Sequence, residues 1–84
     1  MLRLRFFASI RERLGCTELA LPFDAGAVRI EALVARLDAV ELPGCAALLL
    51  ADNTVVARNR SVCAPDTLVA DGDEIAFYPP VTGG

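Results

Sequence analysis

A single stretch of helical periodicity, flanked on both sides by segments that alternate every second residue, restricts the possible folds most. Its apolar residues recur at intervals of three and four, at Ile30, Leu33, Val34 and Leu37. This spacing predicts an amphipathic helix of about 12–14 residues, packed through its apolar stripe on a sheet. Asp24-Ala25-Gly26 is typical of a loop before such a helix, and Pro43-Gly44 ends the region. A chain of 84 residues has room for one domain.

The segments on either side of this helix have the two-residue alternation of β-strands. In the first, Leu2, Leu4 and Phe6 share one face, and Arg3, Arg5 and Phe7 share the other. The predicted strands cover residues 2–8, 17–21, 54–58 and 74–78, with a loop from residue 59 onward. The apolar run at 46–51 fits a strand or a short helix equally well.

Between the first two strands we predict a short helix. Ser9 followed by Glu12 matches a capping box, and Gly15 is a suitable helix end. In the last strand we expect Ile75 and Phe77 to face the core and Glu74, Ala76 and Tyr78 to face outward.

These elements together predict a two-layer α+β domain, in which a mixed sheet of four or five strands packs on one main helix. A β-grasp, ubiquitin-like arrangement fits this order, with residues 1–84 as a single domain. Its last strand lies in mid-sheet beside the first, so Phe7 and Tyr78 would share the outer face. We expect them to form an exposed aromatic docking surface next to a flexible, extended reactive tail at residues 79–84.

Composition excludes several classes of function. The net charge is −3, which argues against nucleic-acid binding. All eight basic residues are arginines, and the absence of histidine removes the usual general base and the commonest metal ligand. The longest apolar run, at 45–51, is far shorter than the roughly 20 residues of a membrane span. The N-terminus does not resemble a signal peptide, so we expect a cytoplasmic protein without membrane attachment.

The three cysteines are far apart in the sequence. Cys16, Cys45 and Cys63 have no spacing typical of zinc or iron–sulfur sites, so no metal site is predicted. We interpret them as small buried hydrophobes in a reducing compartment, with a sulfur-relay cysteine as the alternative.

The C-terminal sequence indicates that the chemistry lies in a main-chain carboxylate. Two glycines, Gly83 and Gly84, form a narrow tether without side chains, and Pro79-Pro80 would project it as a stiff, extended segment. A carboxylate is ionised at neutral pH and is a poor electrophile. A partner must therefore activate it, most simply as an acyl-adenylate made from ATP. A sulfur donor could then displace AMP and leave a thiocarboxylate on Gly84.

Both ends of the chain resemble one family. Residues 4–12 (LRFFASIRE) and 71–84 (DGDEIAFYPPVTGG) are similar to the start and end of the small subunit of molybdopterin synthase, the MoaD family. The resemblance covers essentially the whole chain and implies a β-grasp sulfur carrier in molybdenum cofactor biosynthesis. The resemblance also implies a non-catalytic subunit, with the active site of the synthase on the large subunit.

The resemblance also implies a set of partners. An adenylyltransferase of the ubiquitin-activating type would use ATP to adenylate Gly84, and no cofactor would stay bound to the carrier. A sulfurtransferase or desulfurase would supply persulfide sulfur for the thiocarboxylate. The large subunit would accept the tail and pass the sulfur to cyclic pyranopterin monophosphate to form the molybdopterin dithiolene. The synthase would be a heterotetramer of two small and two large subunits.

The residues that match the family's partner surface are Phe7, Val62 and Tyr78, with Arg11 as a further polar contact. The partner would also bind the tail through Pro79, Pro80, Val81, Thr82 and Gly83. One departure is Arg58-Asn59, which places an arginine where the family commonly has an apolar residue.

Three alternatives remain. One is the sulfur carrier of the thiamine pathway, which shares the fold and the glycine pair. Another is a ubiquitin-like modifier that conjugates Gly84 to lysines of other proteins. The third is a plain interaction module with an idle tail.

Overall fold

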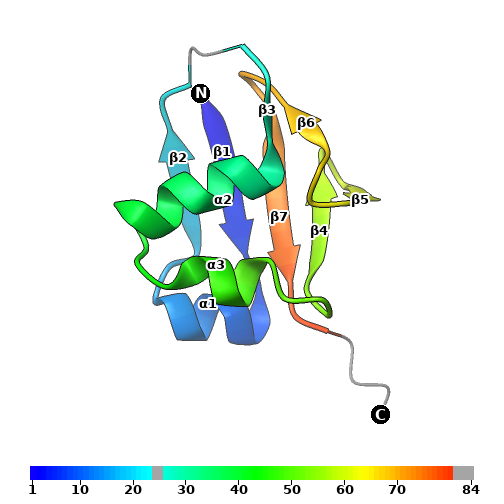
Figure 1. Cartoon of the computed structure of the whole chain (residues 1–84). Helices are drawn as coiled ribbons and strands as arrows, with labels where there is room; N and C mark the ends of the chain where they lie inside the picture. Colours follow the sequence, from blue (N-terminus) through cyan, green and yellow to red (C-terminus); the bar gives the residue numbers. More distant parts are fainter. Residues whose placement is uncertain (24–25, 81–84) are drawn as a thin grey trace.

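In the part of the chain that the structure describes, three helices lie on one side of a five-stranded sheet (Figure 1). The structure, a computed structural model, describes residues 1–23 and 26–80. In chain order the elements are β1 (Leu2–Phe6), α1 (Ala8–Leu14), β2 (Glu18–Leu21), β3 (Val28–Arg29), α2 (Ile30–Ala39), α3 (Cys45–Leu49), β4 (Val55–Arg58), β5 (Ser61–Cys63), β6 (Leu68–Val69) and β7 (Glu74–Tyr78). The predicted α+β, β-grasp fold is confirmed. The loop residues 24–25, predicted to precede the main helix, lie outside the described part.

The strand order of the main sheet is β2-β1-β7-β4-β5. Strands β1 and β7 are parallel neighbours, with Arg3 opposite Glu74 and Phe6 opposite Phe77, while the other pairs are antiparallel. The first and last strands of the chain therefore form the centre of the sheet, as the sequence predicts. The short strands β3 and β6 form a separate two-stranded sheet.

The core lies between the sheet and the apolar stripe of α2. Leu2, Leu4 and Phe6 of β1 are buried, and so are Ile75 and Phe77 of β7. The rings of Phe6 and Phe77 stack with centroids 5.8 Å apart. All four stripe residues of α2 are buried against them, as predicted: Ile30, Leu33, Val34 and Leu37. Each such side chain contributes about 1.5–3 kcal/mol through burial, so this layer supplies much of the stability.

The first helix begins earlier than predicted. Strand β1 ends at Phe6, and Phe7, not Ser9, is the N-cap residue of α1. The capping-box prediction was wrong because the sheet fixes this end of the helix. The Phe7 N–H donates to the Phe77 carbonyl at 3.2 Å, and the Phe7 carbonyl accepts from the Ile10 N–H at 3.1 Å. Gly15 ends the helix in the left-handed region, at φ 66°, as predicted.

The other differences concern short elements. The main helix α2 has 10 residues, fewer than predicted. The ambiguous apolar run is a helix, α3, and not a strand. The predicted loop after residue 58 contains strand β5, which β4 reaches through Asn59 and Arg60, both at positive φ (49° and 71°). This backbone is typical of a two-residue hairpin turn.

Candidate functional site

The root of the predicted tail emerges from the central strand of the sheet. Strand β7 ends at Tyr78, and Pro79 and Pro80 continue the chain at the end of the sheet near α1 (Figure 1). The predicted reactive residue, Gly84, and the predicted partner contacts Val81, Thr82 and Gly83 lie outside the described residues. The structure therefore places the base of the tail and its surroundings.

Phe7 and Tyr78 lie side by side at this root. Their rings stack with centroids 4.6 Å apart and an interplanar angle of 7°. The guanidinium of Arg5 lies 5.1 Å from the Phe7 ring centroid. The shared outer face is confirmed, but the expectation that both rings are exposed was wrong for Phe7. Phe7 is half-buried because Tyr78 and Arg5 cover it, whereas Tyr78 is 37% exposed.

Val62 belongs to the same face. Across the sheet, Arg5 is opposite Ala76, Ala76 is opposite Ala57, and Ala57 is opposite Val62. Val62 is 77% exposed. Together with the aromatic pair, the apolar residues of this row make up what we call the outer-face strip: Phe7, Tyr78, Ala76, Ala57 and Val62. Tyr78 and Val62 are its exposed members, Phe7 is half-buried, and Ala57 and Ala76 are buried.

Ala76 corrects one expectation about this strip. It lies on the outer face, as predicted, yet it is only 5% exposed. Its strand is central and its side chain is short, so the longer cross-strand neighbours, such as Arg5, cover it. Two ion pairs border the strip: the half-buried pair of Arg5 and Glu74 at 3.8 Å, and the exposed pair of Arg3 and Glu18 at 3.2 Å. An apolar centre with a charged rim suits a protein partner.

Arg11 is exposed on α1, four residues after Phe7. Its contact with a partner stays a prediction.

Arg58 has an internal role that the sequence did not reveal. Its Nε donates to Oδ2 of Asp73 at 2.9 Å, while the side-chain amide of Asn59 donates to Oδ1 of Asp73 at 3.0 Å. Arg58 pairs with Ile75, which faces the core, and so it does not belong to the outer-face strip. The arginine at a commonly apolar position therefore holds Asp73, and the strip is formed without it.

The Asp73 carboxyl has a lowered pKa. Its side chain is only 13% exposed, and this burial alone would raise the pKa. Hydrogen bonds from the Ala70 N–H, from Asn59 and from Arg58, together with the Arg58 charge, outweigh burial. Asp73 is therefore a structural carboxylate that ties β4 and β7 together at the end of the sheet away from the tail root.

The cysteines show no arrangement for chemistry in the described residues. Cys45 is buried, and its thiol lies 3.9 Å from the Val34 carbonyl oxygen. Burial, and then the negative charge of Asp38, raise the pKa of the Cys45 thiol. Cys16 and Cys63 are half-buried, which differs from the expectation of full burial. Within residues 1–23 and 26–80 there is no group of three or more Cys, Asp or Glu placed to hold a metal ion.

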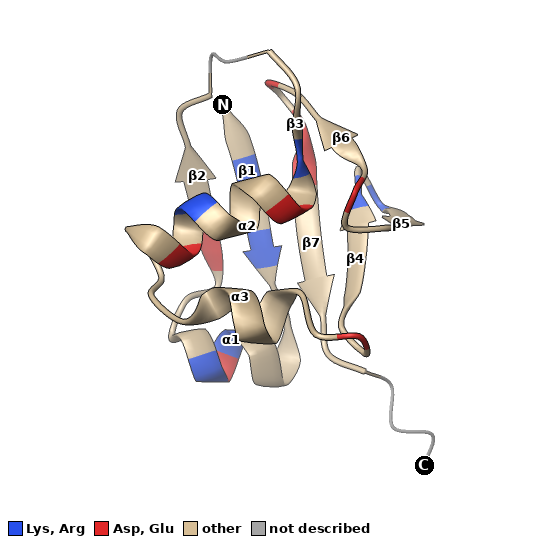
Figure 2. Ribbon diagram, viewed as in Figure 1, with Lys and Arg blue, Asp and Glu red and all other residues tan. Residues whose placement is uncertain are grey.

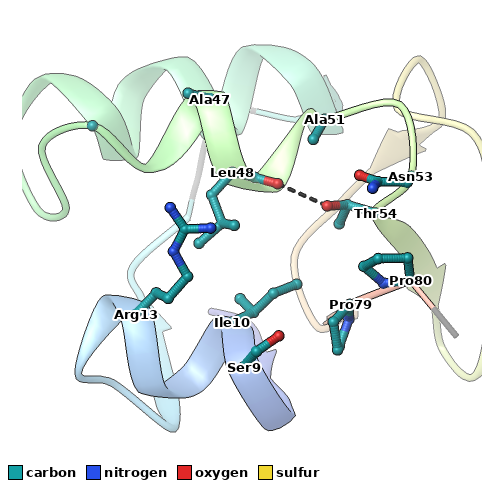
Figure 3. A pocket seen from close by; sticks show the side chains of 11 residues that line it. Ser9, Ile10, Arg13, Ala47, Leu48, Ala51, Asn53, Thr54, Pro79 and Pro80 are labelled. Carbon is teal, nitrogen blue, oxygen red and sulfur yellow. Dashed lines mark hydrogen bonds between the residues drawn. The ribbon is translucent and has the colours of Figure 1, made fainter. Parts of the chain in front are cut away.

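A pocket on the helix side of the tail root escaped the sequence reasoning. Its volume is about 380 Å³, and it lies between α1, α3 and the two prolines (Figure 3). We call it the tail-root pocket, and its lining residues are Ser9, Ile10, Arg13, Gly44, Ala47, Leu48, Ala51, Asn53, Thr54, Pro79 and Pro80. Arg13 follows Ser9 by four residues, a helical spacing that could have indicated a shared face. The other wall of the pocket comes from the packing of α3, which this spacing does not indicate.

Comparisons with known proteins agree with this geometry. A model of the ThiS family matches residues 4–84. The molybdopterin synthase sulfur carrier subunit of Escherichia coli is 37% identical, and the match covers all of both chains. The crystal structure of SAMP1 from Haloferax volcanii is 26% identical with a TM-score of 0.80, covering 99% of this chain and 98% of that one.

A further solved structure is a protein–protein complex, of subunits 1 and 2 of the molybdopterin-converting factor from Helicobacter pylori. Its matching chain is 26% identical with a TM-score of 0.62, and the match covers 99% of this chain and 97% of that one. None of the helices in the described residues is long and apolar enough to span a membrane.

Proposed function

The chain belongs to the ThiS/MoaD family of ubiquitin-like sulfur carriers, and on this premise we propose that it is the sulfur carrier subunit of a molybdopterin synthase. The observation that carries the proposal is the full-length match to a subunit of that name, combined with a tail root that leaves the central strand beside an apolar surface. A large subunit is the partner, as in the complex of the Helicobacter pylori relative.

The chemistry that we propose takes place at Gly84. Its carboxylate attacks the α-phosphate of ATP in an activating adenylyltransferase of the ubiquitin-activating type, and pyrophosphate leaves. The terminal sulfur of a persulfide, supplied by a sulfurtransferase or desulfurase, then displaces AMP and gives an acyl disulfide. A second thiol of the donor attacks the donor's own sulfur in this bond, so that a disulfide forms on the donor and the thiocarboxylate is released. In the large subunit this sulfur is transferred to cyclic pyranopterin monophosphate, and two loaded carriers supply the two dithiolene sulfurs of each molybdopterin.

The carrier itself contributes delivery in this scheme. Pro79 and Pro80 have restricted backbone freedom, which lowers the entropy cost of holding the tail extended in a narrow active site. Glycines at 83 and 84 pass where side chains would collide. ATP is consumed in the partner, and we expect no cofactor to stay bound to this chain. We expect the carrier and its partners to work in the cytoplasm. With the large subunit, the carrier would form a heterotetramer of two small and two large subunits.

Intact mass spectrometry tests the proposal directly. The protein is co-expressed with its adenylyltransferase and sulfur donor, and the mass is compared with that of the protein expressed alone. We expect one oxygen of the terminal carboxylate to be replaced by sulfur. A variant without Gly84 is the control, and it should keep its unmodified mass. A wild-type mass that stays unchanged with active partners would refute the carrier function.

A second function is favoured by the likeness to SAMP1, a small archaeal modifier protein. In this alternative the activated Gly84 carbonyl is attacked by a lysine amine of another protein and forms an isopeptide bond. The chain has no lysine, so it cannot be extended through its own lysine side chains. Immunoblots against the carrier after expression with the adenylyltransferase would show conjugates of higher mass if it is a modifier.

The thiamine-pathway carrier is the remaining alternative, and it would show the same thiocarboxylate. The synthase-subunit name of the full-length relative favours the molybdopterin pathway. Restoration of molybdoenzyme activity in a strain that lacks its own carrier subunit would support that choice, and restoration of thiamine synthesis alone would contradict it.

A further inference from the structure

We propose that the tail-root pocket receives an acidic loop of the large subunit. The inference rests on the proposed function, because it assumes that the tail enters an active site of that subunit. It adds a second contact surface, on the opposite side of the tail root from the outer-face strip.

The position of the pocket supports a partner that surrounds the tail. Pro79 and Pro80 form one wall, while Ser9 and Arg13 of α1 and Ala47 of α3 line others (Figure 3). Val81 is bonded directly to Pro80, so a protein that encloses the following residues must approach the pocket rim. The outer-face strip belongs to the sheet face that the helices leave uncovered, whereas the pocket lies on the helix side. A partner that closes around the tail would meet both.

The charge of the pocket indicates the chemistry of its occupant. Among its described lining residues, only Arg13 is charged, and Figure 3 shows its side chain extending from α1 toward Leu48. Arg13 is exposed, so its guanidinium remains accessible. A guanidinium binds a carboxylate through two parallel hydrogen bonds, which makes aspartate or glutamate the best-matched side chain.

The other polar groups of the pocket are consistent with this choice. The Thr54 hydroxyl already donates to the Leu48 carbonyl at 2.7 Å. Ser9 and Asn53 provide further donors at the rim. Asp52 lies next to Asn53 in sequence but does not line the pocket. Figure 2 shows charges of both signs on α1, where Glu12 lies between Arg11 and Arg13, and Glu12 does not line the pocket either.

The size of the pocket fits one or two side chains. At ~30 Å³ per water molecule, a volume of about 380 Å³ holds about a dozen waters. The space exists because Gly44, Ala47 and Ala51 are small on the side that faces α1. Ile10, Ala47 and Leu48 are apolar lining residues, so a loop that carries an acidic residue beside a short aliphatic one would match the lining and pair with Arg13.

The test uses two variants that change the pocket in different ways. Arg13→Glu reverses its charge, and Ala47→Leu fills its space while remaining compatible with a helix. We expect each to weaken binding of the purified large subunit about tenfold, measured by calorimetry, with Arg13→Lys losing less than Arg13→Glu. Arg36→Glu is the matched control, because Arg36 lies on α2, away from this pocket, and should bind as the wild type does.

The binding measurement tests the pocket independently of the sulfur chemistry. Binding of the large subunit is measured with unloaded carrier, so it does not require a thiocarboxylate. Unchanged affinity of both Arg13→Glu and Ala47→Leu, with thermal melts that show folded protein, would overturn the pocket inference and leave the Gly84 chemistry to the mass test. Weakened binding of the adenylyltransferase alone would also overturn it, because the pocket would then serve the other partner.

Discussion

The Asp73 carboxylate shows how one residue can hold two distant parts of the sequence together. Its oxygens accept from Arg58, from Asn59 and from the Ala70 N–H, and the Asn59 side-chain oxygen accepts from the Glu74 N–H at 3.0 Å. The β4–β5 hairpin and the turn before β7 are thereby joined. Most of these bonds are charge-assisted, which makes them stronger than neutral ones.

Asp73→Asn should reduce stability at neutral pH by about 1–3 kcal/mol, because the charge-assisted bonds weaken. The pKa of Asp73 is lower in the folded than in the unfolded protein, where it is about 3.9. Its stabilisation is therefore complete above that value and is lost as the pH falls toward the folded pKa. Urea titrations between pH 3 and 7 should show a smaller acid loss in Asp73→Asn. Equal acid losses in the two proteins would contradict this role.

The stacked pair of Phe7 and Tyr78 leads to a prediction about binding. Tyr78→Ala should weaken large-subunit binding about tenfold, because it removes an aromatic contact from the outer-face strip. Its cost in stability should be smaller, since the ring is 37% exposed. Tyr78→Phe keeps the stack and serves as control. Calorimetry and thermal melts on the same samples compare the two effects. A variant that loses much stability yet binds with unchanged affinity would assign the ring to the fold.

Among the elements, α3 depends on a neighbour for its start. It has five residues, and Gly44 at its N-cap has no side chain to cap it. Asp38, from α2, takes this role, since its Oδ2 accepts from the Ala46 N–H at 2.8 Å. The same carboxylate helps to raise the pKa of the Cys45 thiol. The position of α3, and with it one wall of the tail-root pocket, is therefore set by α2.

Asp38→Ala should cost about 1 kcal/mol, the usual loss on removing a capping side chain. Asp38→Asn keeps an oxygen acceptor and should lose less. Hydrogen exchange of the Ala46 amide provides a local readout, and it should accelerate in Asp38→Ala. If exchange at Ala46 stayed as in the wild type, Asp38 would not be the cap.

The longer periodic elements were predictable, and the shortest strands were not. The apolar stripe of α2 and the alternation of β1 and β7 reflect burial on one face. In these elements the apolar residues repeat over enough positions for the period to be recognised in the sequence. Strands β3 and β6 have two residues each, too few to show a period. The start of α1 was missed because a sheet hydrogen bond of Phe7, and not a local cap, determines it.

At the scale of the whole molecule, parity along two strands was enough to place Phe7 and Tyr78 together. That argument needed only their neighbouring positions in the sheet, which the β-grasp order supplied. The tail-root pocket could not be predicted in this way. It depends on how α1 packs against α3. The sequences of these two helices contain no pattern that indicates how far apart the helices lie.

The position of the core residues of β7, ahead of the terminal glycines in the sequence, leads to a prediction about truncation. Removal of residues 83–84 should abolish sulfur transfer and leave the unfolding free energy within about 0.5 kcal/mol of the wild type. Removal of residues 74–84 should prevent folding, because Ile75 and Phe77 are part of the core. Circular dichroism and the mass assay give the two readouts. A shorter tail that still carried sulfur would show that the terminal glycine is not the carrier group.

The parallel pairing of β1 and β7 also determines how the molecule bears force. The beginning of β1 and the end of β7 lie at opposite ends of one central ladder. Tension between the N-terminus and the tail root therefore acts along the strands and loads all rungs of the ladder at once, whereas a hairpin pulled at its open end would peel one bond at a time. A partner can draw on the tail without unzipping the strand from which it emerges.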